Sequence, residues 1–138
     1  MTSLQFVRDN QRGRIGQHYV AEMFKSWGAS VKEVEDKFFP DYDIEVNGKT
    51  VEVKYDIRAA ETQNLCLELD ALWHSKAQWL AIVTDNPRTV YFTPLQEVLR
   101  LAQSWPNKKS VGERGEVAAL VPVKDFVSRL NPQVLITN

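Results

Sequence analysis

Three residues in the stretch from Asp41 to Asp56, DYDIEVNGKTVEVKYD, have side chains that could hold a metal ion and direct a water molecule. Asp43 and Glu52 supply carboxylate oxygens, the hard ligands with which proteins bind Mg²⁺, usually together with water and phosphate. A divalent ion lowers the pKa of a water molecule that it binds, which makes that water a usable nucleophile near neutral pH. Lys54 follows Glu52 closely and could position the water or stabilise the charge of a transition state. These residue types therefore indicate metal-assisted hydrolysis.

Alternating apolar residues on both sides of Asn47-Gly48 predict a β-hairpin that brings the two acids together. The alternation has a period of two, which is typical of half-buried strands, and it comprises Ile44, Val46, Val51, Val53 and Tyr55. Asn-Gly is the strongest short hairpin signal, because both turn residues need a positive φ. A two-residue turn sets Asp43 opposite Glu52, with Cβ atoms about 4.5–5.5 Å apart.

The predicted pairing places two negative charges side by side, and they repel unless a cation lies between them. An alternative interpretation is a solvated hairpin face, because exposed hairpins often carry acids and lysines on the side that faces water. Asp41 and Glu45 would belong to the same solvated face. Directly opposed acids are disfavoured in a purely structural sheet. The pairing of Asp43 with Glu52 therefore favours a cation site.

The composition predicts one folded domain, residues 1–138, and excludes several classes of protein. Hydrophobic residues make up 43% of the chain and charged residues 25%, as in ordinary globular domains. The net charge of -1 gives no general attraction to nucleic acid or membrane, so an anion site must be a local patch. Cys66, the single cysteine, excludes an intramolecular disulfide and fits a reducing cytosol. The N-terminus has no apolar signal core and no run approaches the roughly 20 apolar residues of a membrane span, which predicts a cytoplasmic protein without membrane contact.

The order of expected elements predicts an α/β fold. The first helix is expected from about Leu4 to Trp27, with an apolar stripe at helical spacing and Gly28 as its C-cap. The other expected elements are strands at 29–35, 44–46, 49–55, 65–69, 79–84, 89–93 and 117–123, and helical segments at 94–105 and 124–130. Residues 58–64 and 106–116 are expected to be loops, and 70–78 a loop or a short helical turn. This order predicts a central mixed β-sheet of about four to five strands flanked by helices.

The ordered set of motifs resembles the PD-(D/E)XK nuclease superfamily. Pro40-Asp41 matches the "PD" of that signature, and Glu52-Val53-Lys54 matches its E-x-K. Upstream, GRIGQHYVAEMFKSWGASV is similar to the first helix of the Holliday-junction-resolvase-like branch. Downstream, TQNLCLEL and SKAQWLAIV resemble the next core strands of phage and bacterial members, so the resemblance extends from about Gly13 to Thr93.

The resemblance implies a restriction-endonuclease-like core and a DNA endonuclease that uses Mg²⁺ or Mn²⁺ to hydrolyse phosphodiester bonds. The resolvase-like branch implies selectivity for DNA structure, action as a homodimer, and a location in the cytoplasm, or in the host cytoplasm if the chain is phage-encoded. Two alternatives stay open. One is a restriction-type or phage nuclease on other DNA, and the other is a non-catalytic DNA-binding module that retains the fold.

The resemblance also implies roles for individual residues. Asp43 and Glu52 would hold the metal, the Val53 carbonyl would be a further ligand, and Lys54 would position the attacking water. Asp41 shares the strand parity of Asp43, but Asp43 directly faces Glu52 and is assigned to the metal. Asp41 would then contact the residues that bind the metal, or would bind a second, outer metal ion.

The first helix departs from the family pattern, because Gln17 stands where the family has a glutamate. Glutamine can coordinate or donate a hydrogen bond but brings no negative charge. At about 100° per residue, Gln17 lies at the border of the buried helix face, whereas Glu22 faces water. We therefore expect Gln17 to orient the water or a phosphate and Glu22 to be solvated. The missing charge is the feature that favours the non-catalytic alternative.

Arginines near the start of the first helix are candidate phosphate contacts. Arg12 and Arg14 are the two that we assign to DNA, because arginine side chains and backbone amides at a helix N-terminus suit phosphate groups. The alternative interpretation is a solvated, frayed N-terminus.

Overall fold

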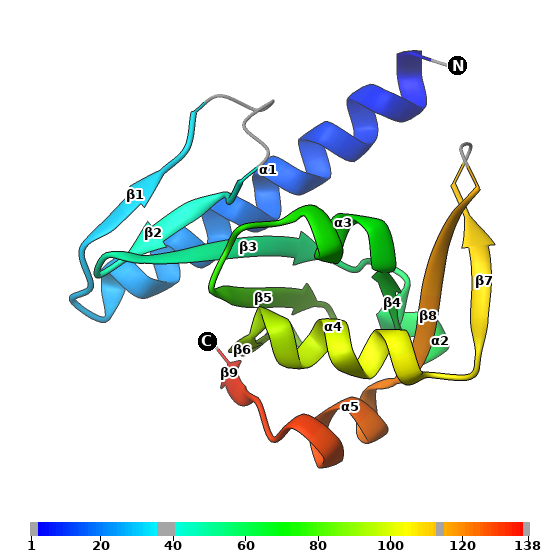
Figure 1. The fold of residues 1–138 in the computed structure, drawn as a ribbon. Helices are drawn as coiled ribbons and strands as arrows, with labels where there is room; N and C mark the ends of the chain where they lie inside the picture. Colours follow the sequence, from blue (N-terminus) through cyan, green and yellow to red (C-terminus); the bar gives the residue numbers. More distant parts are fainter. Residues whose placement is uncertain (1–2, 36–40, 113–114, 137–138) are drawn as a thin grey trace.

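The computed structural model describes residues 3–35, 41–112 and 115–136, with side chains described from residue 13 onward. Five helices and nine strands alternate along this part of the chain (Figure 1). The helices are α1 (Ser3–Ser26), α2 (Ala59–Thr62), α3 (Leu69–His74), α4 (Leu95–Ser104) and α5 (Val123–Leu130). The strands are β1 (Val31–Glu33), β2 (Ile44–Val46), β3 (Lys49–Tyr55), β4 (Asn64–Glu68), β5 (Trp79–Thr84), β6 (Thr89–Pro94), β7 (Lys108–Val111), β8 (Glu116–Pro122) and β9 (Gln133–Ile136).

A six-stranded mixed sheet forms the centre of the molecule, in the order β1-β2-β3-β5-β6-β9. Strands β3 and β5 are parallel, and the other neighbours in this sheet are antiparallel. The predicted α/β class, with a mixed sheet flanked by helices, is confirmed. The sheet has more strands than the four or five expected, because the tail adds β9 at the edge beside β6. That strand is mostly exposed and so shows no buried alternation in the sequence.

A second, three-stranded sheet follows the order β4-β8-β7. Its edge strand β7 lies in the segment that was expected to be a loop, so that expectation is wrong. The sequence of β7, KKSV, is polar and mostly exposed, and it becomes a strand by pairing with β8. The expected loop at 58–64 is also partly wrong, because it contains the short helix α2.

The hairpin forms with the register that the sequence predicts. Val46 pairs with Lys49, and Ile44 pairs with Val51. The turn residues Asn47 and Gly48 have φ values of 51° and 82°, which are the left-handed conformations that this turn requires. This register places Ile44 and Val51 on the same face of the hairpin, where both side chains are fully buried.

Helix α1 covers that apolar face of the sheet. Its buried residues Val20 and Met23 belong to the same core cluster as Ile44, Val51 and Val53. Trp27, at the end of the predicted apolar stripe, is exposed instead of buried. None of the described helices is long and apolar enough to cross a bilayer.

Helices α3, α4 and α5 contribute to a second core on the other side of β5 (Figure 1). This core includes Leu72 from α3, Leu95 from α4 and Phe126 from α5, packed with Leu80 and Ile82 of β5. The two cores lie on opposite faces of β3 and β5. Because successive strand residues point to opposite faces, Glu52 and Lys54 project away from α1 and toward the side of this second core.

The close approach of α1 to β3 depends on Gly16. A Cβ atom at this position would lie 3.0 Å from the Cβ of Tyr55 and 3.7 Å from a methyl carbon of Val53. Helix α1 can therefore reach the sheet only because residue 16 has no side chain.

We predict that Gly16→Ala destabilises the protein, although alanine is the better helix residue. Overpacking lowers the free energy of unfolding by about 1–3 kcal/mol. This loss exceeds the gain of about 0.5–1 kcal/mol that alanine brings over glycine inside a helix. Gly13 of the same helix is the matched control, because a Cβ there meets nothing within 4 Å. Urea unfolding should show Gly16→Ala less stable than the wild type and Gly13→Ala as stable or more stable. Equal stability of the two variants would contradict the packing of α1 on β3.

Candidate active site

Asp43 lies just before β2 and is held by hydrogen bonds on both sides. Its backbone N–H donates to the carbonyl of Val51 over 2.9 Å, and its own carbonyl accepts from the N–H of Val34 over 2.9 Å. Its carboxylate oxygen Oδ2 accepts from the N–H of Val53 over 2.7 Å. Because Val51 also pairs with Ile44, two residues oppose one here, as in a β-bulge. These bonds fix the carboxylate of Asp43 beside β3.

Glu52, on β3, has a nearly buried carboxylate whose two oxygens have different partners. Oε1 accepts from the hydroxyl of Ser75 over 3.2 Å, and Oε2 lies 3.1 Å from Nζ of Lys54. The side chain of Glu52 is 13% exposed, and that of Lys54 is 45% exposed. The acid is therefore held under the surface, with the amine at its outer side.

The charges of these three residues influence one another. Burial and, after it, the nearby charge of Glu52 raise the pKa of Asp43 to about 6, against the lowering effects of the Val53 N–H and of Lys54. Burial works against the charge of Lys54, but the acids Glu52, Asp43 and Glu68 outweigh it, so the pKa of Lys54 is raised. The site therefore holds two interacting carboxylates and an ammonium group. The predicted register holds from Val46–Lys49 to Ile44–Val51, but the bulge at Asp43 replaces the direct pairing with Glu52 that an unbulged hairpin would give.

The backbone of Val53 is oriented toward Asp43. The N–H and C=O of one strand residue point to the same side, and the Val53 N–H points to Asp43. The Val53 carbonyl is therefore directed past the end of β2 and away from β5. This is the orientation that a carbonyl ligand beside Asp43 needs.

Asp41 is tied to the segment that follows α3. Its carbonyl accepts from the N–H of Lys76 over 2.9 Å and from the hydroxyl of Ser75 over 3.4 Å, and its carboxylate lies 3.8 Å from Nζ of Lys76. Ser75 thus contacts both Asp41 and Glu52. The structure places Asp41 next to the Glu52 carboxylate through this shared hydroxyl, whereas Asp43 bonds β3 directly.

The helix residues expected at the site lie on its α1 side. Nε2 of Gln17 donates to the carbonyl of Val34 over 3.2 Å, and the N–H of Val34 in turn donates to Asp43. Gln17 is therefore connected to Asp43 through the backbone of Val34. As expected, Gln17 is half-buried and Glu22 is exposed. The exposed Arg14 donates to the carbonyl of Glu35 over 3.1 Å, and the side chain of Arg12 lies outside the described residues.

A cavity of about 280 Å³ opens beside Lys54. Its polar lining includes Asp56 and Glu68, and its apolar lining includes Leu72 and Leu80. Asp56 links the end of β3 to β4 and α2, because its carboxylate accepts from the N–H groups of Cys66 over 2.8 Å and of Ala59 over 3.2 Å.

Glu68 and Asp56 were not among the predicted site residues, whereas Ser75-Lys76 was expected near the edge of the site by resemblance to related nucleases. A signal existed for Glu68, because alternation in LCLEL places it on the face opposite the buried Leu65 and Leu67. The contact of Ser75 with Glu52 had no local signal in the sequence, because the two residues are 23 positions apart.

The chain shares its fold with a solved endonuclease. No family model matches it, and no curated protein matches it either. It is similar to the structure of a bacterial homing endonuclease, I-Ssp6803I, with a TM-score of 0.53. The two sequences are 13% identical, and the match covers 65% of this chain and 71% of the other. The predicted nuclease-like α/β fold is confirmed by this similarity, and membership of the PD-(D/E)XK superfamily stays a prediction.

We predict that Asp43→Asn stabilises the metal-free protein at pH 7. The folded-state pKa of Asp43, about 6, exceeds the value of 3.8 for a free aspartate, so the folded chain holds this proton more tightly. The stability from this group is therefore present below about pH 3.8 and is lost as the pH rises to about 6. Asparagine stays neutral and can still accept from Val53, so the gain at pH 7 should be about 1–3 kcal/mol.

Urea unfolding in EDTA at pH 4 and pH 7 measures this difference. The free energy of unfolding of Asp43→Asn should exceed that of the wild type at pH 7 and should be closer to the wild-type value at pH 4. Asp70→Asn on the exposed surface of α3 is the control and should show no such pH-dependent gain. A variant that is less stable at pH 7 than at pH 4, relative to the wild type, would contradict the raised pKa that burial and the charge of Glu52 give to Asp43.

Proposed function

We propose that the protein is a DNA endonuclease that hydrolyses phosphodiester bonds with Mg²⁺ or Mn²⁺. The observation that carries the proposal is the meeting of two carboxylates and an amine at the start of β2. The charge of Glu52 contributes to raising the pKa of Asp43, and Lys54 lies 3.1 Å from Glu52. The fold supports the proposal, because it is similar to that of a homing endonuclease.

The donor set fits a hard divalent cation. Asp43 binds the Val53 N–H through Oδ2, and we assign its other oxygen to the cation. Glu52 would add a second carboxylate and Val53 a carbonyl, and oxygen ligands of these kinds are those that Mg²⁺ prefers. The bound cation would supply Lewis-acid chemistry that stabilises negative charge on the phosphate. It would also remove the repulsion between the two acids.

Lys54 acts in this proposal as a hydrogen-bond donor and a positive charge. Although burial lowers the pKa of Lys54, the neighbouring acids raise it more, which favours the charged form of the amine. An ammonium group can hold the attacking water and stabilise charge that develops on the phosphate oxygens. Its 45% exposure leaves it accessible to a substrate.

The other predicted site residues lie around the two carboxylates and Lys54. The bond from Gln17 to Val34 favours a positioning role, because it fixes the backbone to which Asp43 is bonded. The role of Gln17 in orienting a water or a phosphate stays a prediction, as does a role for Asp41 behind the metal ligands. We assign phosphate contacts to Arg12 and Arg14.

The resemblance to the resolvase-like branch adds three further parts to the proposal. They are selectivity for branched DNA, action as a homodimer and a cytoplasmic location. Cleavage of duplex or other DNA in the manner of a restriction-type or phage nuclease requires the same site residues. A non-catalytic DNA-binding module is the second candidate, and the neutral Gln17 is the feature that favours it.

We predict that Glu52→Gln and Lys54→Ala each reduce cleavage of supercoiled and four-way-junction DNA by about 100-fold or more. Each change removes a charged group from the place where charge develops during hydrolysis. The assay compares Mg²⁺, Mn²⁺ and EDTA, with thermal unfolding as a check that the variants fold. Glu45→Gln is the matched control, because Glu45 is an acid of the same hairpin that faces Thr50.

Two outcomes decide between the candidates. Cleavage that persists in both variants would rule out this site. DNA binding by the wild type without cleavage, in each of several divalent metals, would favour the non-catalytic module. A preference for the junction over the supercoiled duplex would support the resolvase-like assignment.

A further inference from the structure

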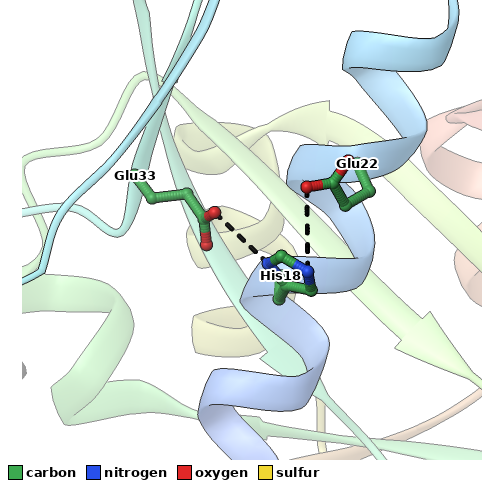
Figure 2. A group of neighbouring side chains, drawn as sticks. All are labelled: His18, Glu22 and Glu33. Carbon is green, nitrogen blue, oxygen red and sulfur yellow. Dashed lines mark hydrogen bonds and ion pairs between the residues drawn. The ribbon is translucent and has the colours of Figure 1, made fainter.

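A second cluster of ligand side chains lies where α1 meets β1, away from Lys54. It consists of His18 and Glu22 on α1 and Glu33 at the end of β1 (Figure 2). His18 and Glu22 are separated by one helical turn and so share a face of α1. One ligand atom from each of the three residues lies within 4.8 Å of the others.

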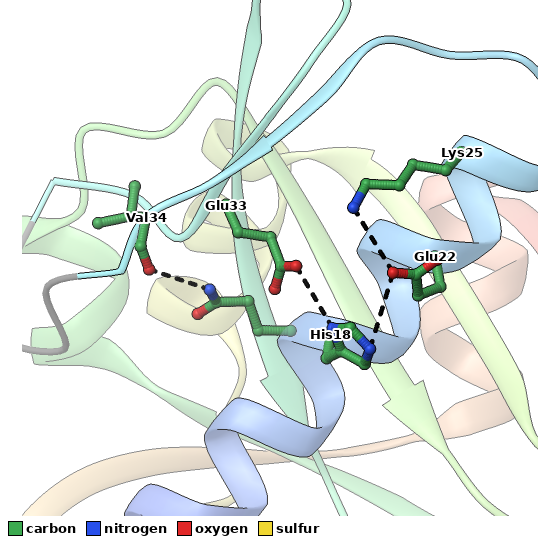
Figure 3. Close-up of polar contacts among 6 residues, drawn as sticks. His18, Glu22, Lys25, Glu33 and Val34 are labelled. Atoms are coloured by element: carbon green, nitrogen blue, oxygen red, sulfur yellow. Dashed lines mark hydrogen bonds and ion pairs between the residues drawn. The ribbon is translucent and has the colours of Figure 1, made fainter.

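The imidazole of His18 lies between the two carboxylates. Nδ1 is 3.3 Å from Oε2 of Glu33, and Nε2 is 3.7 Å from Oε1 of Glu22. Lys25 reaches the same oxygen of Glu22, with Nζ at 3.5 Å (Figure 3). The cluster therefore combines two carboxylates, one imidazole and a single competing ammonium group. The side chain of His18 is 65% exposed, so an ion from solution can reach it.

The donor set differs in kind from the one at Asp43 and Glu52. An imidazole nitrogen with carboxylate oxygens suits Zn²⁺ and similar transition metals, whereas Mg²⁺ prefers oxygen ligands alone. Three protein ligands with water in the fourth position are common around Zn²⁺, at about 2.0–2.2 Å from nitrogen and oxygen. The three ligand atoms lie within 4.8 Å of one another, and rotation of the exposed His18 and Glu22 side chains would let all three reach one ion.

We propose that His18, Glu22 and Glu33 form a binding site for a divalent transition-metal ion of the Zn²⁺ class. The ion would join α1 to β1. Gln17, which precedes His18, already donates a hydrogen bond to Val34, which follows Glu33. The N–H of Val34 in turn donates to the carbonyl of Asp43. The ion would thus fasten the helix to the strand beside the contact that positions Asp43. The proposal does not depend on the proposed nuclease function.

A similar pair on α3 provides a matched control. His74 and Asp70 are also one helical turn apart, with Nδ1 at 3.3 Å from Oδ1 and both side chains exposed. Among the described residues, the only group of three or more potential ligands is the cluster of His18, Glu22 and Glu33. A histidine–acid pair alone is therefore present on α3, and the third ligand is what distinguishes the α1–β1 cluster.

The test measures Zn²⁺ affinity of the full chain after removal of metals, by competition with a chromophoric chelator. We expect the wild type to bind one Zn²⁺. The affinity should fall roughly tenfold or more in His18→Ala and in Glu33→Gln. Substituting residues that only support metal ligands already lowers metal affinity by about 10–100-fold. Lys25→Gln should bind more tightly, because the ammonium no longer competes for Glu22. His74→Ala and Glu52→Gln should bind as the wild type does.

Co²⁺ provides an independent readout, because its visible absorption reports nitrogen and oxygen coordination. The spectrum of bound Co²⁺ should be lost in His18→Ala and kept in His74→Ala. Wild-type binding that is absent, or that survives both His18→Ala and Glu33→Gln, would overturn the proposal. Loss of binding in Glu52→Gln would overturn it as well, since the ion would then belong to the Asp43–Glu52 pair.

Discussion

The repulsion between the carboxylates of Asp43 and Glu52 is the constraint on which the proposed chemistry depends. The fold keeps both acids close and partly buried, and burial together with the charge of Glu52 raises the pKa of Asp43. Lys54 offsets part of the repulsion through its ion pair with Glu52. A divalent cation would offset more of it, because it can interact with both acids at once. The site therefore has a physical reason to bind metal.

The strands maintain this arrangement because β2 and β3 differ in length. β2 begins only at Ile44, whereas β3 continues past this partner to Tyr55. At that point the carboxylate of Asp43 takes the N–H of Val53, which an extended β2 would otherwise bind through its backbone. Helix α1 supports one side of this junction through Gln17 and Val34, and Ser75 supports the other. The two proposed metal sites then lie at the two ends of one chain of contacts, with hard oxygen ligands at Asp43 and a mixed set at His18.

The local parts of this arrangement could be predicted from the sequence, and the long-range parts could not. Asn47-Gly48 and period-two alternation specify the hairpin register as far as Ile44 and Val51, which places Asp43 and Glu52 next to the last pair. The bulge at Asp43 had no signal in the sequence. Strands β7 and β9 have no apolar alternation. β7 pairs with β8 across the turn that contains Gly112 and Gly115, although its polar sequence does not resemble a strand. β9 pairs with β6, which is distant in the sequence. Ser75 reaches Glu52 from 23 positions away and Glu33 reaches His18 from 15, and single-sequence patterns carry no information on such contacts. The acceptor of Gln17 was unpredictable for the same reason.

A double-mutant cycle between Asp43→Asn and Glu52→Gln tests the central claim most directly, because it isolates the interaction of the two acids from their bonds to Val53, Ser75 and Lys54. The free energy of unfolding would be measured for the four proteins, first in EDTA and then in saturating Mg²⁺. The account predicts a repulsive coupling energy in EDTA that changes to an attractive one in Mg²⁺, where the acids share the cation. A coupling energy near zero in both conditions, or one that Mg²⁺ leaves unchanged, would contradict it.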